Sequence, residues 1–355
     1  MTGIFKTARF WSVAVAAGLI LSLLFIVSVG CGDSTTTTSA TTAKTTAESK
    51  GMIYVAVTGA GELAAGAGNM GMAVVNLDTK KVEMVNLAEA KAPHGIIFSA
   101  DTPTAANTDG RIADAAPKTM LLGNADGGSV NIIDMATKKV VKTINAPSGA
   151  TLAICGMQKG PDGKIYLTSM GDGKVYVVDG VAGTITDTGV GGGDVTQSIC
   201  GIAWTKDGKS AYLSNMFNPK DPTMAGYVAK VEWPSGKLIK KIENVTKVAP
   251  GGSPMAHQSQ MTPDFKFLYV TDGADGAVVK VDLTTDTIAK TIPVGKEPHS
   301  IVFSADGKTG YIAVRHEPVE NESSVFIYDV EKDQVTDRIP GIAAPLICGL
   351  VWSQK

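Results

Sequence analysis

The chain has little of the charge that nucleic-acid-binding proteins carry. Charged residues make up only 19% of its 355 residues, and the formal net charge is −2. No run of basic residues stands out beyond the N-terminal segment. Proteins that bind nucleic acid need such a basic patch to neutralise phosphates. We therefore exclude nucleic acid as a partner.

Common catalytic and cofactor motifs are also missing. The sequence contains no Cys-x-x-Cys-His, so covalent attachment of a c-type haem is excluded. It contains no Gly-x-Ser-x-Gly elbow, no Walker loop and no His-Glu-x-x-His pair. We assign no catalytic residue from the sequence.

Helical patterning is scarce after residue 50. Short alternating segments are instead separated by turn residues, and the chain has 40 glycines and 16 prolines. This pattern is typical of all-β proteins.

The N-terminus has the features of an export signal. Lys6 and Arg9 precede an uncharged, mainly apolar run over residues 11–29, and Cys31 follows between two glycines. This arrangement resembles a bacterial lipoprotein signal. It predicts a signal peptide over residues 1–30 and lipidation of Cys31. The apolar run is also long enough to remain as an uncleaved membrane anchor. In both cases the membrane is a partner, and the rest of the chain is extracytoplasmic, on the periplasmic or cell-surface side.

Within residues 31–51, the stretch 34–50 consists almost entirely of threonine, serine and alanine. Such a segment has too few apolar side chains to offset the entropy of ordering. We expect a disordered tether here and a folded domain over residues 52–355.

The folded domain is built from an internal repeat. Each unit opens with a short apolar run, and in all but one unit, which has Met120 instead, the next strand carries a tyrosine near its start. These tyrosines are Tyr54, Tyr166, Tyr212, Tyr269 and Tyr311. An apolar strand then ends in an acidic residue. These acids are Asp78, Asp134, Asp179, Glu232, Asp282 and Asp329. With a further strand this makes four short antiparallel strands in roughly 42 to 61 residues, which is the pattern of a β-propeller blade.

Counting these units predicts an all-β, six-bladed β-propeller. Residues 53–87 supply three strands and residues 348–353 supply one, so the two ends of the domain would share a blade. This closure would remove the free sheet edges. A seven-bladed ring is the alternative, but it needs another unit, and the insertion over residues 100–118 has the composition of a polar loop.

Two segments carry a resemblance to a known family. Tyr269-Val270-Thr271-Asp272 and Pro298-His299-Ser300, the latter with Ala305-Asp306-Gly307, resemble the YVTN-type repeat of the YncE-like exported β-propeller proteins. The resemblance extends over about residues 52–355. It implies the propeller fold and export. Because the motif consists of turns and core strands, it implies no particular chemistry.

Histidine and cysteine recur at one position of the repeat. The residues that open the innermost strands are His94, Cys155, Cys200, His257, His299 and Cys348. In a propeller, these side chains would surround one mouth of the central channel. Apart from Cys31 all cysteines fall in this set, as do three of the four histidines. Both residue types bind transition metals, so the set predicts a site for copper, zinc or iron.

Four further residues are expected near this ring. Met170 and Met216 end the second strands of the two internal cysteine blades, and thioethers favour Cu(I). Arg315 and His316 follow the second strand of the blade that His299 opens. We predict all four as accessory residues.

The ring could also arise without binding a metal. Duplication of an ancestral blade would repeat a histidine without any function, and a buried cysteine or methionine often serves only in packing. Cys155 and Cys200 lie on neighbouring blades, so in an oxidising compartment they could form a disulfide instead of binding a metal.

Two functions therefore stay open from the sequence. The chain is either a binding protein, with a protein or small-molecule partner on its loop-rich face, or a metal-binding redox protein with its site at the ring. A hydrolase or lactonase would rest only on analogy with other propellers.

Overall fold

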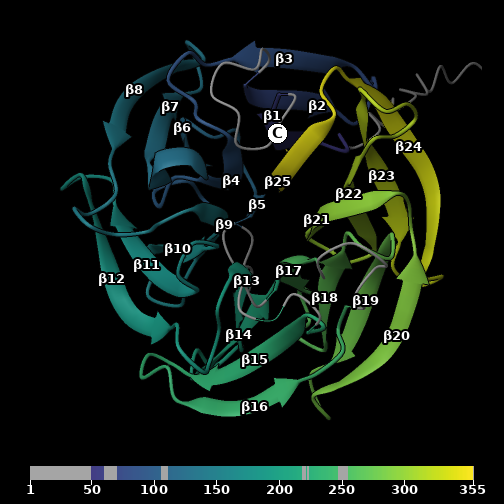
Figure 1. Cartoon of the computed structure of the whole chain (residues 1–355). Helices are drawn as coiled ribbons and strands as arrows, with labels where there is room; N and C mark the ends of the chain where they lie inside the picture. The colour runs from purple at the N-terminus through teal and green to yellow at the C-terminus, as the bar shows by residue number, and fades with distance from the viewer. Residues whose placement is uncertain are drawn as a thin grey trace, which may run out of the picture. The chain divides into compact units, whose positions relative to one another are not determined.

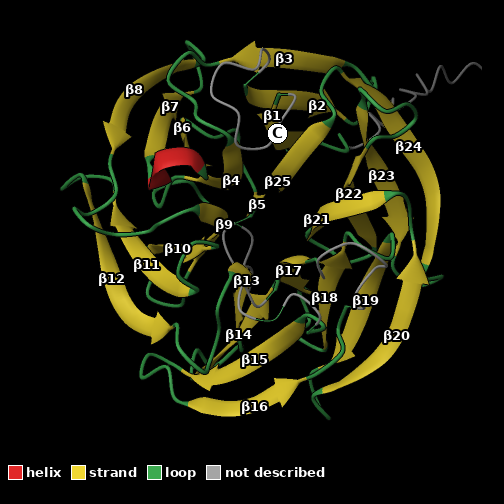
Figure 2. Ribbon diagram, viewed as in Figure 1, coloured by secondary structure: helices red, strands yellow, loops and turns green. Residues whose placement is uncertain are grey.

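The computed structural model describes residues 49–59, 70–104, 111–217, 221, 224–246 and 255–354. The predicted signal peptide, Cys31 and most of the predicted tether lie outside the described residues. Within this part of the chain, apart from one 3-10 turn, η1 (Asp126–Gly128), the regular structure is all β (Figure 2). No helix in the described part has the length and hydrophobicity that a membrane span needs.

The strands form six sheets around a central axis, as the blades of a propeller (Figure 1). From the axis outward, blade 1 contains β25 (Leu346–Ser353), β1 (Met52–Thr58), β2 (Gly71–Asn76) and β3 (Val82–Asn86). Blade 2 contains β4 (Pro93–Phe98), β6 (Thr119–Asn124), β7 (Val130–Asp134) and β8 (Lys139–Ile144). Blade 3 contains β9 (Ile154–Lys159), β10 (Ile165–Ser169), β11 (Lys174–Asp179) and β12 (Thr184–Gly191).

The remaining blades have the same order. Blade 4 contains β13 (Ile199–Trp204), β14 (Ser210–Asn215), β15 (Tyr227–Glu232) and β16 (Leu238–Ile242). Blade 5 contains β17 (Ala256–Met261), β18 (Phe267–Asp272), β19 (Ala277–Asp282) and β20 (Thr287–Pro293). Blade 6 contains β21 (Glu297–Phe303), β22 (Thr309–Arg315), β23 (Ser323–Asp329) and β24 (Gln334–Ile342). The six-bladed prediction is confirmed.

The two ends of the domain close the ring, as predicted. β25 pairs antiparallel with β1, from Met52 opposite Ser353 to Thr58 opposite Leu346. The expectation of a polar loop over residues 100–118 was wrong for one short segment. There β5 (Ile112–Ala113) pairs parallel with β25, and both of its apolar side chains are fully buried.

The recurring tyrosine serves packing between blades. Tyr166 lies 5.2 Å from the ring of Trp204, and Tyr269 lies 5.1 Å from that of Phe303, measured between ring centroids. In both pairs the tyrosine on a second strand packs against the aromatic residue near the end of the next blade's innermost strand. Aromatic pairs at this distance add to the energy of apolar burial, so the motif holds neighbouring blades together.

The recurring acids are turn residues. Asp179 accepts hydrogen bonds from the backbone N–H groups of Val181 and Ala182, at 2.9 and 2.8 Å. Asp282 and Asp329 do the same in their own blades. These carboxylates therefore close the turn between the third and fourth strands.

Candidate functional site

In every blade a β-bulge occurs at the ring residue and changes the direction of its side chain. The pairing between the first and second strands shifts register across each of the six predicted ring residues. In blade 6, for example, Pro298 lies opposite Val314 and Ser300 opposite Ala313, which leaves His299 unpaired in the ladder. Bulges commonly redirect a side chain at functional sites. All six ring residues are buried.

The ring residues divide into two groups. Cys155 and Cys200 form a disulfide across blades 3 and 4, with their Cα atoms 4.8 Å apart. The Sδ atom of Met216 lies 3.9 Å from the Sγ atom of Cys200, and Met170 packs against the same cluster. Disulfide sulfurs are not thiolate ligands, so the bonded pair lies outside any thiolate ligand set. Met170 and Met216, predicted as accessory residues of the ring, therefore lie beside this disulfide.

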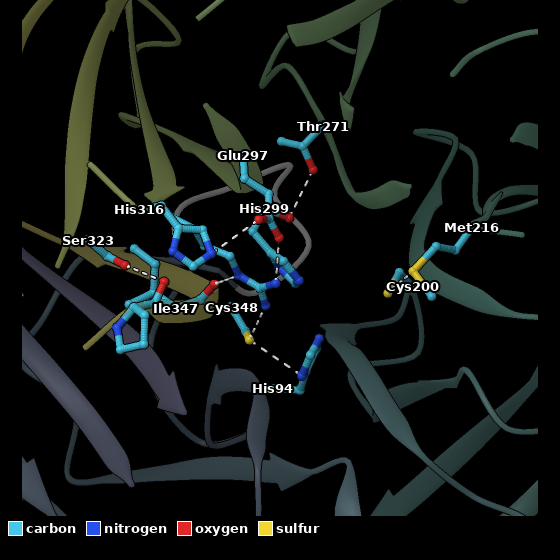
Figure 3. A network of polar contacts seen from close by, with 12 residues as sticks. His94, Cys200, Met216, Thr271, Glu297, His299, His316, Ser323, Ile347 and Cys348 are labelled. Carbon is cyan, nitrogen blue, oxygen red and sulfur yellow. Dashed lines mark hydrogen bonds and ion pairs between the residues drawn. The ribbon is translucent and has the colours of Figure 1, made fainter. Parts of the chain in front are cut away.

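The second group is a compact cluster of His94, His299 and Cys348. One potential ligand atom from each lies within 4.8 Å of the others. The Sγ atom of Cys348 is 3.4 Å from Nδ1 of His94 (Figure 3). The ring of His257 stacks on that of His299, with centroids 3.9 Å apart and planes 26° apart. Cys200 and Met216 lie apart from this cluster in the same view.

His299 is the most unusual member of the cluster. Its side chain is fully buried, and neither ring nitrogen has a hydrogen-bond partner in the described part of the chain. Burial, together with the positive charge of Arg315, lowers the pKa of His299 well below 6.5, so the imidazole is neutral. Thr271 Oγ1 donates to the backbone carbonyl of His299 at 2.9 Å and holds this segment in place. A buried polar group without a partner costs stability, which marks a position that a ligand could satisfy.

Arg315 connects the cluster to the surface of the mouth. Its Nη2 donates to the sulfur of Cys348 at 3.0 Å, its Nε to the carbonyl of Ile347 at 2.8 Å, and its Nη1 to Glu297 at 2.8 Å. His316 Nε2 lies 3.4 Å from the other Glu297 oxygen. Arg315 and His316 therefore lie where the sequence predicted, next to the ring. A cation beside a cysteine stabilises the thiolate form.

Sequence reasoning missed a set of buried polar residues that form hydrogen bonds between blades. Buried Arg111 donates to the carbonyl of Ser259 at 2.6 Å. Gln258 donates to the carbonyl of Cys155 at 3.1 Å and accepts from Ser300 at 2.9 Å. The bonds of Gln258 tie blade 5 to its neighbour blade 6 and to blade 3. The sequence did contain a feature that distinguishes Gln258. It directly follows ring residue His257, and four of the other blades have glycine at the equivalent position.

Comparisons with known proteins agree with this fold. No protein-family model matches the chain. Two curated relatives, both called uncharacterized protein YncE, come from Salmonella typhi and Salmonella typhimurium. Each is 23% identical over 221 residues, which is 62% of this chain and 57% of the relative. This distant similarity agrees with the resemblance to YncE, while the match to the YVTN repeat itself stays a prediction.

Two solved structures share the architecture at lower identity. Hydrazine synthase of Kuenenia stuttgartiensis is 17% identical with a TM-score of 0.51, covering 75% of this chain and 73% of that one. A chain of a nidogen/laminin complex is 11% identical with a TM-score of 0.57, covering 84% and 97%. At such identities the likeness concerns the fold alone. The chain is therefore a six-bladed propeller by its own structure, and part of its sequence is distantly similar to YncE.

Proposed function

We propose that the chain is an exported, lipid-anchored propeller of the YVTN type that binds its partner at the channel mouth. One observation carries the proposal: buried His94, His299, Cys348 and Arg315 converge at one end of the channel, with His299 lacking any hydrogen bond from its ring in the described part of the chain. Polar groups that converge from several strands are typical of ligand sites.

Export is supported by two independent features. The N-terminal segment ends at Cys31 in the arrangement of a lipoprotein signal. The disulfide between Cys155 and Cys200 suits an oxidising compartment, because such bonds are kept reduced in most bacterial cytosols.

The anchor is tested by labelling cells that express the full chain with a radioactive fatty acid. We expect label on the wild type and none on Cys31→Ser, which lacks the acylated thiol. A membrane-bound but unlabelled wild type would favour the uncleaved anchor. Recovery of the wild type in the cytoplasm would contradict export.

Binding at the mouth is tested by thermal shift of the full chain in detergent, using a panel of metal ions, small anions and neutral metabolites. At least one compound should raise the melting temperature of the wild type and not that of His299→Ala. Gly180→Ala, a change on a distant turn, is the control and should respond like the wild type. A panel that never separates wild type from His299→Ala would contradict the proposal.

The second candidate function is metal binding at the same mouth. The observation that favours it is the grouping of two imidazoles and one thiol within 4.8 Å. Imidazole and thiolate together are ligands for copper, zinc or iron.

A further inference from the structure

We infer that His94, His299 and Cys348 form a three-coordinate site for Cu(I) at the channel mouth. This inference rests on the proposed role of the mouth as the binding site, and it names the ligand. The three residues come from β4, β21 and β25, the innermost strands of three consecutive blades. Ligands on strands of a closed ring are held more rigidly than ligands on loops.

The spacing suits a metal ion. Bonds of about 2.3 Å to sulfur and about 2.0 Å to nitrogen put these two ligands about 3.7 Å apart around a trigonal ion. The observed distance between Cys348 Sγ and His94 Nδ1 is 3.4 Å, and all three ligand atoms lie within 4.8 Å of one another. Small rotations of the side chains would complete the triangle.

The surroundings of His299 and Cys348 suit metal ligands. His299 is buried with neither ring nitrogen hydrogen-bonded in the described part of the chain, so a metal would satisfy an otherwise costly group. The guanidinium of Arg315 donates a hydrogen bond to the sulfur of Cys348 at 3.0 Å and holds that sulfur at the cluster.

Among the described cysteines, Cys348 is the one that keeps its thiol. The other two are joined to each other, so neither can form a disulfide with it. A cysteine outside the disulfides of an exported protein indicates a reactive thiol or a metal ligand. Full burial beside an imidazole favours the ligand.

The kind and number of the ligands favour Cu(I). Thiolate sulfur suits both Cu(I) and zinc, but structural zinc sites use four protein ligands rather than three. The cluster in the described residues has three members.

The test is an anaerobic competition between the full chain in detergent and a chromophoric Cu(I) chelator, bicinchoninate. Ascorbate keeps copper reduced without opening the disulfide, which thiol counting verifies. We expect one Cu(I) per chain, and X-ray absorption should show one sulfur and two nitrogen neighbours. Cys348→Ser and His299→Gln should each weaken binding at least 100-fold.

Matched controls separate this site from the other sulfur atoms. Met216→Leu and the double variant Cys155→Ala/Cys200→Ala should keep one Cu(I) per chain. Circular dichroism and melting temperature verify that each variant folds. If Cys348→Ser does not fold, His94→Gln provides the same test.

Three outcomes would overturn the inference. They are no Cu(I) binding by the wild type, unchanged binding by folded Cys348→Ser and His299→Gln, or stoichiometric Zn(II) binding without Cu(I). A non-metal ligand that stabilises the wild type but not His299→Ala would then leave the proposed binding function standing.

Discussion

The sulfur of Cys348 lies 3.4 Å from Nδ1 of His94, although the two residues are 254 positions apart in the chain. They meet because β25 completes blade 1 and its inner edge faces β4 of blade 2 (Figure 1). Closing the ring therefore also assembles the candidate site.

The state of the cysteines makes the first prediction. In the Cys31→Ser background, the denatured and unreduced chain should show one reactive thiol, which belongs to Cys348. After reduction it should show three, counted with a thiol-reactive chromophore. Adding Cys348→Ser should lower both counts by one. Three thiols before reduction would contradict the disulfide.

The disulfide should contribute substantially to stability. It links residues 45 positions apart. Closing a loop of this length stabilises the fold by about 4 kcal/mol in the chain-entropy estimate. We expect a non-thiol reductant to lower the guanidinium midpoint of the Cys31→Ser chain. The additional change Cys155→Ala/Cys200→Ala should give a low midpoint that no longer responds to the reductant.

Two threonines at matching positions should separate stability from metal binding. Thr271 donates to the carbonyl of His299 at 2.9 Å, and Thr168 accepts from the N–H of Gly156 at 2.8 Å. Each valine substitution should cost about 1 kcal/mol of unfolding free energy. Only Thr271→Val should also weaken Cu(I) binding, by about tenfold, since it positions a proposed ligand. Equal affinities in the two variants would contradict that positioning role.

Close packing around the axis should make Gly156 irreplaceable. A Cβ atom there would lie 2.2 Å from the carbonyl oxygen of Cys200, which is backbone and cannot move aside. Gly156→Ala should destabilise the protein by about 3 kcal/mol, as expected for an overpacked core. Gly180→Ala is the control, because its Cβ would meet nothing closer than 3.7 Å. Chemical denaturation of both variants checks the difference.

The ionisation of Asp333 should account for part of the loss of unfolding free energy at acidic pH. Burial by itself would raise the pKa of Asp333, but hydrogen bonds from Tyr328 and Lys290 and the charge of Lys280 outweigh it and hold the pKa below 3.8. A carboxylate with a lowered pKa stabilises the fold above its unfolded pKa, and this contribution is lost as the pH falls through the folded pKa.

Asp333→Asn should therefore lower the unfolding free energy at pH 7 by about 2 kcal/mol, because Lys280 loses its partner. The gap from the wild type should persist down to about pH 4 and shrink below it. Denaturant titrations at pH 7, 5 and 3 measure it. A gap that stays constant down to pH 3 would contradict the assignment.

Much of the fold followed from local regularities. The tyrosines and turn acids recur because each blade buries the same face and turns in the same way, so the count of six and the shared blade could be deduced from the sequence. The ring position was equally accessible, because the bulge falls at the same place in every repeat. The buried strand at Ile112–Ala113 was not, because two residues carry too little pattern to predict a strand.

From the sequence alone, the repeat pattern predicted that six histidines and cysteines surround one mouth of the channel. It left open which of them would meet. Which residues meet depends on which blades are neighbours and on distances of a few ångström. Cys155 and Cys200 lie close enough to form a disulfide, and Met216 packs against it. His94, His299 and Cys348 form a separate cluster, to which Arg315 is hydrogen-bonded. Repeat patterns encode contacts within a blade, whereas contacts across the axis arise only when the ring closes, and only the tertiary structure decides them.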